Sequence, residues 1–191
     1  MIITLIGYRG TGKSSVAQPL AARLGWKAVD ADVELEARTG RTIREIFAQD
    51  GESEFRRLER QVLVELLKQT RLVLAAGGGA ILNGKTRDDL KSAGPVIWLN
   101  ASAATIEHRL YGDATTADRR PDLTAQGGRS EVELLLTQRQ PLYAACASLE
   151  IHTDVPNEGA AGVPLPDEIA ERIYSWLQAA VPGFSEGEAT L

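Results

Sequence analysis

A glycine-rich segment near the start of the chain, GYRGTGKS at residues 7–14, has the residue types and spacing of a phosphate-binding loop. Its glycines would let backbone N–H groups turn toward phosphate oxygens, because no Cβ stands in the way. Lys13 would bring its ammonium to the β- and γ-phosphates of a nucleoside triphosphate, and Ser14 would offer its hydroxyl to Mg²⁺. The segment therefore predicts a nucleotide site.

The residues on either side of this segment are those that such a loop requires. Residues 1–6 form a largely apolar run that predicts a buried strand, and Val16, Leu20 and Leu24 follow at helical spacing. A helix beginning near Lys13 would add its positive N-terminal dipole and its unpaired N–H groups to the loop. The alternative is an ordinary glycine-rich turn with Lys-Ser behind it by chance, and the flanking strand and helix favour the phosphate loop.

Two acidic residues close the next predicted strand, in WKAVDAD at residues 26–32. On an extended chain Asp30 and Asp32 would point the same way, toward the edge of the sheet where ligands gather. One carboxylate could support Mg²⁺ while the other accepts a proton or a hydrogen bond from a substrate hydroxyl. The competing interpretation is that Asp32 caps the following helix. Beside a phosphate loop we favour the functional interpretation.

Basic residues and glycines further along could bind an anionic substrate. In GESEFRRLE, Arg56 follows the apolar Phe55 and can reach a site, whereas Arg57 is expected on the solvated helix surface. In AAGGGA, the glycines at 77–79 follow a predicted strand, where a ligand could approach the backbone closely. A flexible turn is the alternative for these glycines.

The second half of the chain contains three further arginines that could bind a phosphate or a substrate. The stretch at 112–128 carries Arg119 and Arg120 and is long for a connection, which is typical of a lid or of a disordered loop. In RQPLY, Arg139 lies near the end of a predicted helix, where it could instead bond to helix-end carbonyls.

Composition limits the classes of protein that this chain can belong to. At 191 residues it is about one domain, with a hydrophobic content of 43% and a charged content of 25% that are ordinary for a soluble globular protein. The net charge of −5 argues against a nucleic-acid or anionic-membrane surface, so phosphate affinity must be local. Cys146 is the only cysteine, which favours a reducing compartment. These features predict a cytoplasmic enzyme or switch.

Predicted strands alternate with predicted helices along the chain, which indicates an open parallel α/β sheet with right-handed crossovers. We expect a helix that begins at Thr42 and stops at Gly51, and another that ends near Pro141. Residues 1–180 are predicted to form a single domain, with a flexible tail at 181–191.

Taken together, GYRGTGKS, DAD, GESEFRRLE, GGGA, RRP and RQPLY resemble the motifs of the shikimate kinases, in order and at suitable intervals, from residue 1 to about 180. The resemblance implies a P-loop kinase of the nucleoside-monophosphate-kinase type, with a five-stranded parallel sheet in the order 2-3-1-4-5 between two layers of helices. It also implies a shikimate-binding region near 31–62 and a lid near 112–128. Such enzymes transfer the γ-phosphate of ATP to the 3-hydroxyl of shikimate, giving shikimate 3-phosphate in the chorismate pathway to aromatic amino acids.

The same resemblance assigns roles to particular residues. The catalytic residues would be Lys13, Asp32 and Arg120. The residues that bind ATP would be Gly10, Thr11, Gly12, Lys13, Ser14, Ser15 and Arg120. The residues that bind shikimate would be Asp32, Arg56, Gly78, Gly79 and Arg139. The cofactor Mg²⁺ would be held by Ser14 and, through water, by Asp30. A monomer that binds neither nucleic acid nor membrane is expected.

Departures from the family pattern lie mainly in the lid, which contains RRPDL in place of the commoner R-P-L-L ending and is a few residues longer than usual. They leave the choice between Arg119 and Arg120 open, and Arg109 remains a further candidate for nucleotide contact. A gluconate-type sugar-acid kinase is the nearest alternative, but it would not require the FR, GGG and R-x-PLY elements together. A second alternative is a catalytically silent nucleotide sensor. The absence of Lys13 or Asp32 would favour a sensor, but both residues are present.

Overall fold

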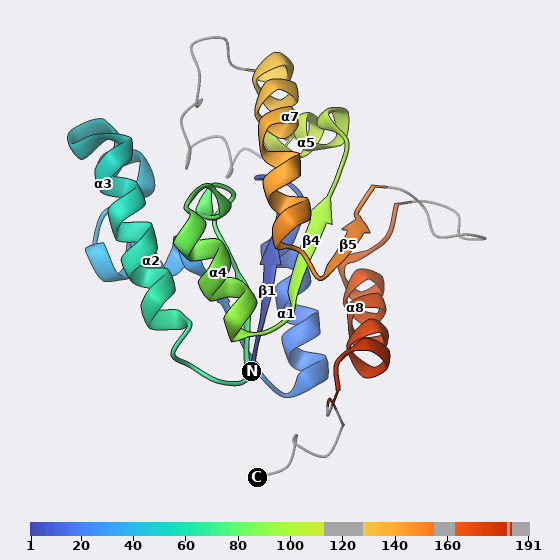
Figure 1. The fold of residues 1–191 in the computed structure, drawn as a ribbon. Helices are drawn as coiled ribbons and strands as arrows, with labels where there is room; N and C mark the ends of the chain where they lie inside the picture. Colours follow the sequence, from blue (N-terminus) through green and yellow to red (C-terminus); the bar gives the residue numbers. More distant parts are fainter. Residues whose placement is uncertain (113–127, 155–162, 183, 185–191) are drawn as a thin grey trace.

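A parallel sheet lies at the centre of the computed structural model, which describes residues 1–112, 128–154, 163–182 and 184 (Figure 1). Its strands are β1 (Ile2–Ile6), β2 (Lys27–Asp30), β3 (Leu72–Ala75), β4 (Val96–Asn100) and β5 (Leu149–His152). They run in the order β2-β3-β1-β4-β5 and all pair in parallel. The predicted sheet and its strand order are confirmed.

Helices follow the strands in nearly regular alternation. The helices are α1 (Lys13–Leu24), α2 (Ala31–Thr39), α3 (Ile43–Leu66), α4 (Gly84–Ala93), α5 (Ala103–Gly112), α7 (Gly128–Cys146) and α8 (Pro166–Ala180), with a short 3-10 helix η1 (Ala80–Leu82). Among the helices in the described ranges, none combines the length and the apolar character needed to cross a membrane.

The helices form one layer on each face of the sheet. Successive strand residues face opposite sides, so Ile3 and Leu5 of β1 pack with α1 and α8, whereas Ile2 and Ile6 pack with α2, α3, α4 and α7. Because both faces are covered, every residue of β1, β3 and β4 is buried. This accounts for the continuous apolar run at residues 1–6, which is typical of parallel strands.

The helix boundaries follow from local signals in the sequence. Thr42 forms a capping box with Glu45: its Oγ1 accepts from the Glu45 backbone N–H at 3.2 Å, and its own N–H donates to Glu45 Oε2 at 2.7 Å. The helices α1 and α2 end at Gly25 and Gly40, both with φ of 66°, in the left-handed region that glycine adopts without strain.

Two of the predicted helix ends differ from the structure. The helix that begins after Thr42 does not stop at Gly51; Gly51 breaks the regular geometry with φ 80° and ψ 177°, and α3 resumes to Leu66. Helix α7 passes through Pro141 and continues to Cys146. Proline removes one backbone donor, but Leu136 before it and Tyr143 after it are both buried and hold the helix in place.

We expect Thr42→Ala to lower the free energy of unfolding by about 1 kcal/mol, because the backbone N–H of Glu45 in the first turn of α3 loses its capping partner. For a chain of this size the midpoint of thermal unfolding should fall by about 2–4 °C. Thr137→Ala is the control, since Thr137 is exposed within α7 and its hydroxyl donates to Glu133 O of the same helix. Equal effects of the two substitutions in calorimetry would contradict the capping role.

Candidate active site

The glycine-rich segment forms the turn between β1 and α1. Gly7, Gly10 and Gly12 have φ of 143°, 80° and 89°, which side chains with a Cβ rarely adopt. At Gly7 a Cβ would also overlap the carbonyl oxygen of Leu99 on β4. The backbone path of this loop therefore depends on glycine.

Lys13 lies across the loop rather than extending into solvent. Its Nζ donates to the carbonyl oxygens of Gly7 at 3.0 Å and Tyr8 at 2.8 Å, and the residue is buried. Thr11 is also buried and donates from Oγ1 to Tyr8 O at 2.8 Å, whereas Ser14 and Ser15 are exposed in the first turn of α1. The structure thus places a cation and the first N–H groups of a helix at one loop, an arrangement that suits phosphate.

Ser14 and Asp30 meet at the edge of this loop. The Ser14 hydroxyl donates to Asp30 Oδ2, and Asp30 Oδ1 accepts from the backbone N–H groups of Asp32 at 2.9 Å and Val33 at 3.3 Å. One hydroxyl and one carboxylate are among the oxygen ligands that Mg²⁺ takes beside bound phosphates, and the ion usually keeps several of its waters. The pair therefore fits a magnesium ion held partly through water.

The placement of Asp32 corrects one sequence prediction. The strand β2 ends at Asp30, and Asp32 lies in the first turn of α2, so the two residues are not on one extended chain. The residue that caps α2 is Asp30 and not Asp32. The Asp32 carboxylate instead lines a pocket between α2, α3 and the loop after β3.

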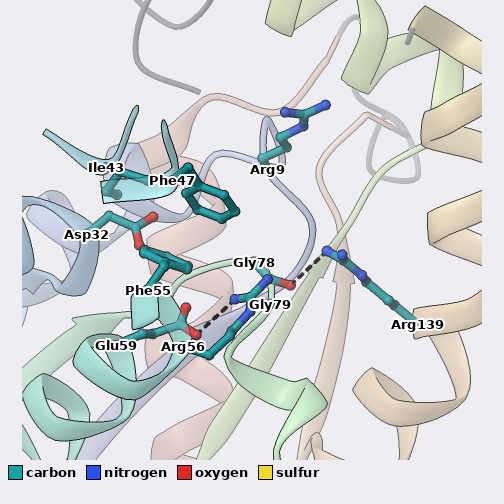
Figure 2. Close-up of a pocket in the computed structure, with 10 residues that line it drawn as sticks. All are labelled: Arg9, Asp32, Ile43, Phe47, Phe55, Arg56, Glu59, Gly78, Gly79 and Arg139. Carbon is teal, nitrogen blue, oxygen red and sulfur yellow. Dashed lines mark hydrogen bonds and ion pairs between the residues drawn. The ribbon is translucent and has the colours of Figure 1, made fainter. Parts of the chain in front are cut away.

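Figure 2 shows that this pocket gathers residues from distant parts of the chain. All five residues predicted to bind the substrate line it: Asp32, Arg56, Gly78, Gly79 and Arg139. Sequence reasoning did not assign the other lining residues, which are Arg9, Ile43, Phe47, Phe55 and Glu59. The rings of Phe47 and Phe55, with centroids 4.8 Å apart, add an apolar surface to the pocket, and the guanidinium of Arg56 lies over the Phe55 ring. A small ligand with a carboxylate, hydroxyls and an apolar ring face would suit this lining.

Arg56 is held in the pocket wall by two glutamates. Its Nη1 donates to Glu59 Oε2 at 2.9 Å, and its Nε and Nη2 donate to Glu52 Oε1 at 3.2 and 3.1 Å. Burial of Arg56 acts to lower its pKa, but the two glutamates outweigh this effect and raise the pKa overall. Burial raises the pKa of Glu59, while Arg56 opposes the rise. Arg56 therefore stays charged and points where a carboxylate could reach it.

The glycines after β3 allow this approach. A Cβ on Gly79 would overlap the guanidinium of Arg56, and a Cβ on Gly77 would lie 2.5 Å from Glu59 Oε1. Gly78 accepts from Tyr143 Oη at 2.6 Å and from Arg139 Nη1 at 3.5 Å. Helix α7 is thereby tied to the pocket floor, and the GGG segment is more than a flexible turn.

Four other arginines considered in the sequence lie elsewhere in the described structure or outside it. Arg119 and Arg120 lie outside the described residues, as does nearly all of the predicted lid. Arg109 donates to the carbonyl oxygens of Gly10 at 3.2 Å and Thr153 at 2.9 Å, so it braces the phosphate loop against the segment after β5. Arg57 is exposed and paired with Glu54, as expected for a solvated surface residue.

Comparison with known proteins agrees with this geometry. A family model for shikimate kinase matches residues 9–178. A shikimate kinase of Rhodopirellula baltica is 44% identical over 153 residues, covering 80% of this chain and 82% of that protein. One of Thermobifida fusca is 39% identical over 179 residues, covering 94% and 96%.

Solved structures lead to the same family. A shikimate kinase from Acinetobacter baumannii in complex with shikimate superposes with a TM-score of 0.84 at 33% identity, covering 95% of this chain and 94% of that one. The fold, the phosphate loop beside the arginine-lined pocket and the similarity along most of both chains lead to one conclusion. This chain belongs to the shikimate kinase family.

Proposed function

We propose that this chain is a shikimate kinase, which transfers the γ-phosphate of ATP to the 3-hydroxyl of shikimate and releases ADP and shikimate 3-phosphate. The observation that carries the proposal is the single pocket in which Asp32 faces Arg56 and Arg139, beside a phosphate loop. Arginines bind a carboxylate through paired, charge-assisted hydrogen bonds. A substrate with one carboxylate and a hydroxyl at its far end would be oriented by these groups.

The nucleotide would lie on the phosphate loop. Backbone N–H groups of the loop and the Lys13 ammonium would hold the β- and γ-phosphates, since phosphoryl transfer depends on alignment and charge stabilisation. Mg²⁺ near Ser14 and Asp30 would neutralise charge on the bound phosphates. Arg120 is proposed to contribute further positive charge from the lid.

Asp32 would act on the acceptor. Its carboxylate is proposed to accept a hydrogen bond from the 3-hydroxyl and to take up the proton as the new bond to phosphorus forms. The separation of roles explains why the pocket has an acidic group from α2 and basic groups from α3 and α7. The relative from Acinetobacter baumannii was solved with shikimate, which supports this acceptor over gluconate.

We infer one domain over residues 1–180 that works as a monomer in the cytoplasm, with ATP and shikimate as its ligands and no nucleic-acid partner. The net charge of −5 supports the absence of a nucleic-acid partner, and the single cysteine supports a reducing compartment.

A coupled assay of ADP release tests the proposal directly. With ATP and Mg²⁺, we expect shikimate to stimulate ADP release strongly over the rate without an acceptor. Gluconate at the same concentration should give little stimulation. Equal stimulation by gluconate would favour a sugar-acid kinase, and release that needs no acceptor would favour an ATPase or a sensor.

Asp32→Asn should reduce kcat by roughly 100-fold or more, because the amide cannot accept the proton of the hydroxyl. The KM for ATP should stay near its original value. Glu34→Gln is the matched control on the same helix, since Glu34 pairs with Arg38 away from the pocket. Wild-type turnover in a folded Asp32→Asn enzyme would refute the assigned role.

Arg56→Ala should weaken shikimate binding about ten- to a hundredfold, since a hydrogen bond to a charged group contributes roughly 1.5–3 kcal/mol. Its neighbour supplies the control: Arg57→Ala removes an exposed arginine paired with Glu54 and should change little. Titration calorimetry with shikimate and with ATP separates the two sites. A selective loss of ATP affinity would move Arg56 to the nucleotide side.

A further inference from the structure

A buried ion pair joins the phosphate loop to helix α7. Arg9 Nη2 lies 2.7 Å from Glu131 Oε1, and the side chains are 10% and 0% exposed. The residues are 122 positions apart in sequence. Arg9 lines the acceptor pocket, whereas Glu131, on α7, is not among the residues that line it. A carboxylate removed from water in this way carries a large desolvation cost, so it needs its partner.

The same helix carries the pocket residue Arg139, and one aromatic ring links the two arginines. The guanidinium carbon of Arg9 lies 5.8 Å from the centroid of the Tyr8 ring, and that of Arg139 lies 5.5 Å from it. Tyr8 is buried in a cluster with α5 and α7. Two guanidinium groups thus lie close to one buried ring, one from the phosphate loop and one from α7, and like charges held near each other repel.

We propose that Glu131 is a positioning residue for the acceptor site and that it acts through Arg9. Glu131 neutralises the guanidinium of Arg9 and holds it in the pocket wall. Arg139 thereby keeps the position from which it binds the acceptor carboxylate. The inference rests on the proposed function. It adds a residue that does not line the pocket and that the family motifs quoted from the sequence do not include.

The geometry indicates what the loss of the Glu131 charge would do. Arg139 is bonded to Gly78 O at a long distance of 3.5 Å, so its position also depends on the charges around it. With Glu131 uncharged, the repulsion between Arg9 and Arg139 is no longer offset from α7. Either arginine would shift, and the acceptor carboxylate would lose alignment with its partners. Acceptor binding should suffer more than the chemical step.

Glu131→Gln tests the proposal because the amide keeps the size of the side chain and removes the charge. We expect the KM for shikimate to rise about tenfold, equivalent to ~1.4 kcal/mol, with kcat and the KM for ATP changed by less than about threefold. Glu131→Asp, which keeps the charge, should recover part of the loss. Glu133→Gln is the matched control, since Glu133 is exposed on α7 and pairs with Arg129.

A double-mutant cycle then tests the route through Arg9. In an Arg9→Met background, Glu131→Gln should raise the KM for shikimate no further, because the charge that it balanced is gone. The same tenfold rise in that background would show that Glu131 does not act through Arg9. A fall in thermal stability with an unchanged KM would show a structural role alone. Either result overturns the inference.

The wild-type enzyme separates this inference from the proposed function. No shikimate-dependent ADP release by the wild type would overturn both. Normal wild-type activity together with a wild-type KM in Glu131→Gln would overturn only the role of Glu131. If Glu131→Gln does not fold, the KM for shikimate is measured in Glu131→Asp instead. We expect this KM to lie between the wild-type value and a tenfold increase. A wild-type KM in Glu131→Asp would then count against the proposal.

Discussion

The position of Ala75 in the sheet sets the geometry on which the site depends. Ala75 ends β3 and is paired on one side with Leu5 of β1 and on the other with Asp30 of β2. Because the strands are parallel, the three chain segments that leave the sheet here start at nearly the same level. These segments are the phosphate loop, the start of α2 and the glycine loop. A slip of one residue in either pairing would turn the side chains of a strand to the other face and separate these groups.

Charge balance is the second constraint on the site. Arginines from three elements line one pocket, and three bare guanidinium groups in a partly buried space would destabilise the fold. Each has a fixed counterpart: Arg56 has Glu59 and Glu52, Arg9 has Glu131, and Arg139 has the Gly78 carbonyl and the Tyr8 ring. These partners hold the arginines in place before a substrate arrives, so less ordering is required when it binds.

Helix α7 connects the parts of the site. It contacts the phosphate loop through Glu131, the glycine loop through Tyr143 and the acceptor pocket through Arg139. Its path through Pro141 matters here, because Tyr143 could not reach Gly78 from a helix that stopped at the proline. The helix is held by its contacts on both sides of Pro141, which explains why the local sequence signal for a helix end did not prevail.

The sequence by itself determined the parts that depend on local chemistry. The glycine spacing between a buried strand and a helix identified the phosphate loop, the alternation of strands and helices identified the parallel sheet, and capping residues such as Thr42 marked helix starts. Motifs at suitable intervals identified the family and the residues that meet in the pocket. Only the tertiary structure decided which residues support them, because Arg9 with Glu131 and Tyr143 with Gly78 are contacts between distant segments. It also decided that Asp30, and not Asp32, caps α2, since the end of β2 is set by pairing with β3 and local residue preferences do not contain that pairing.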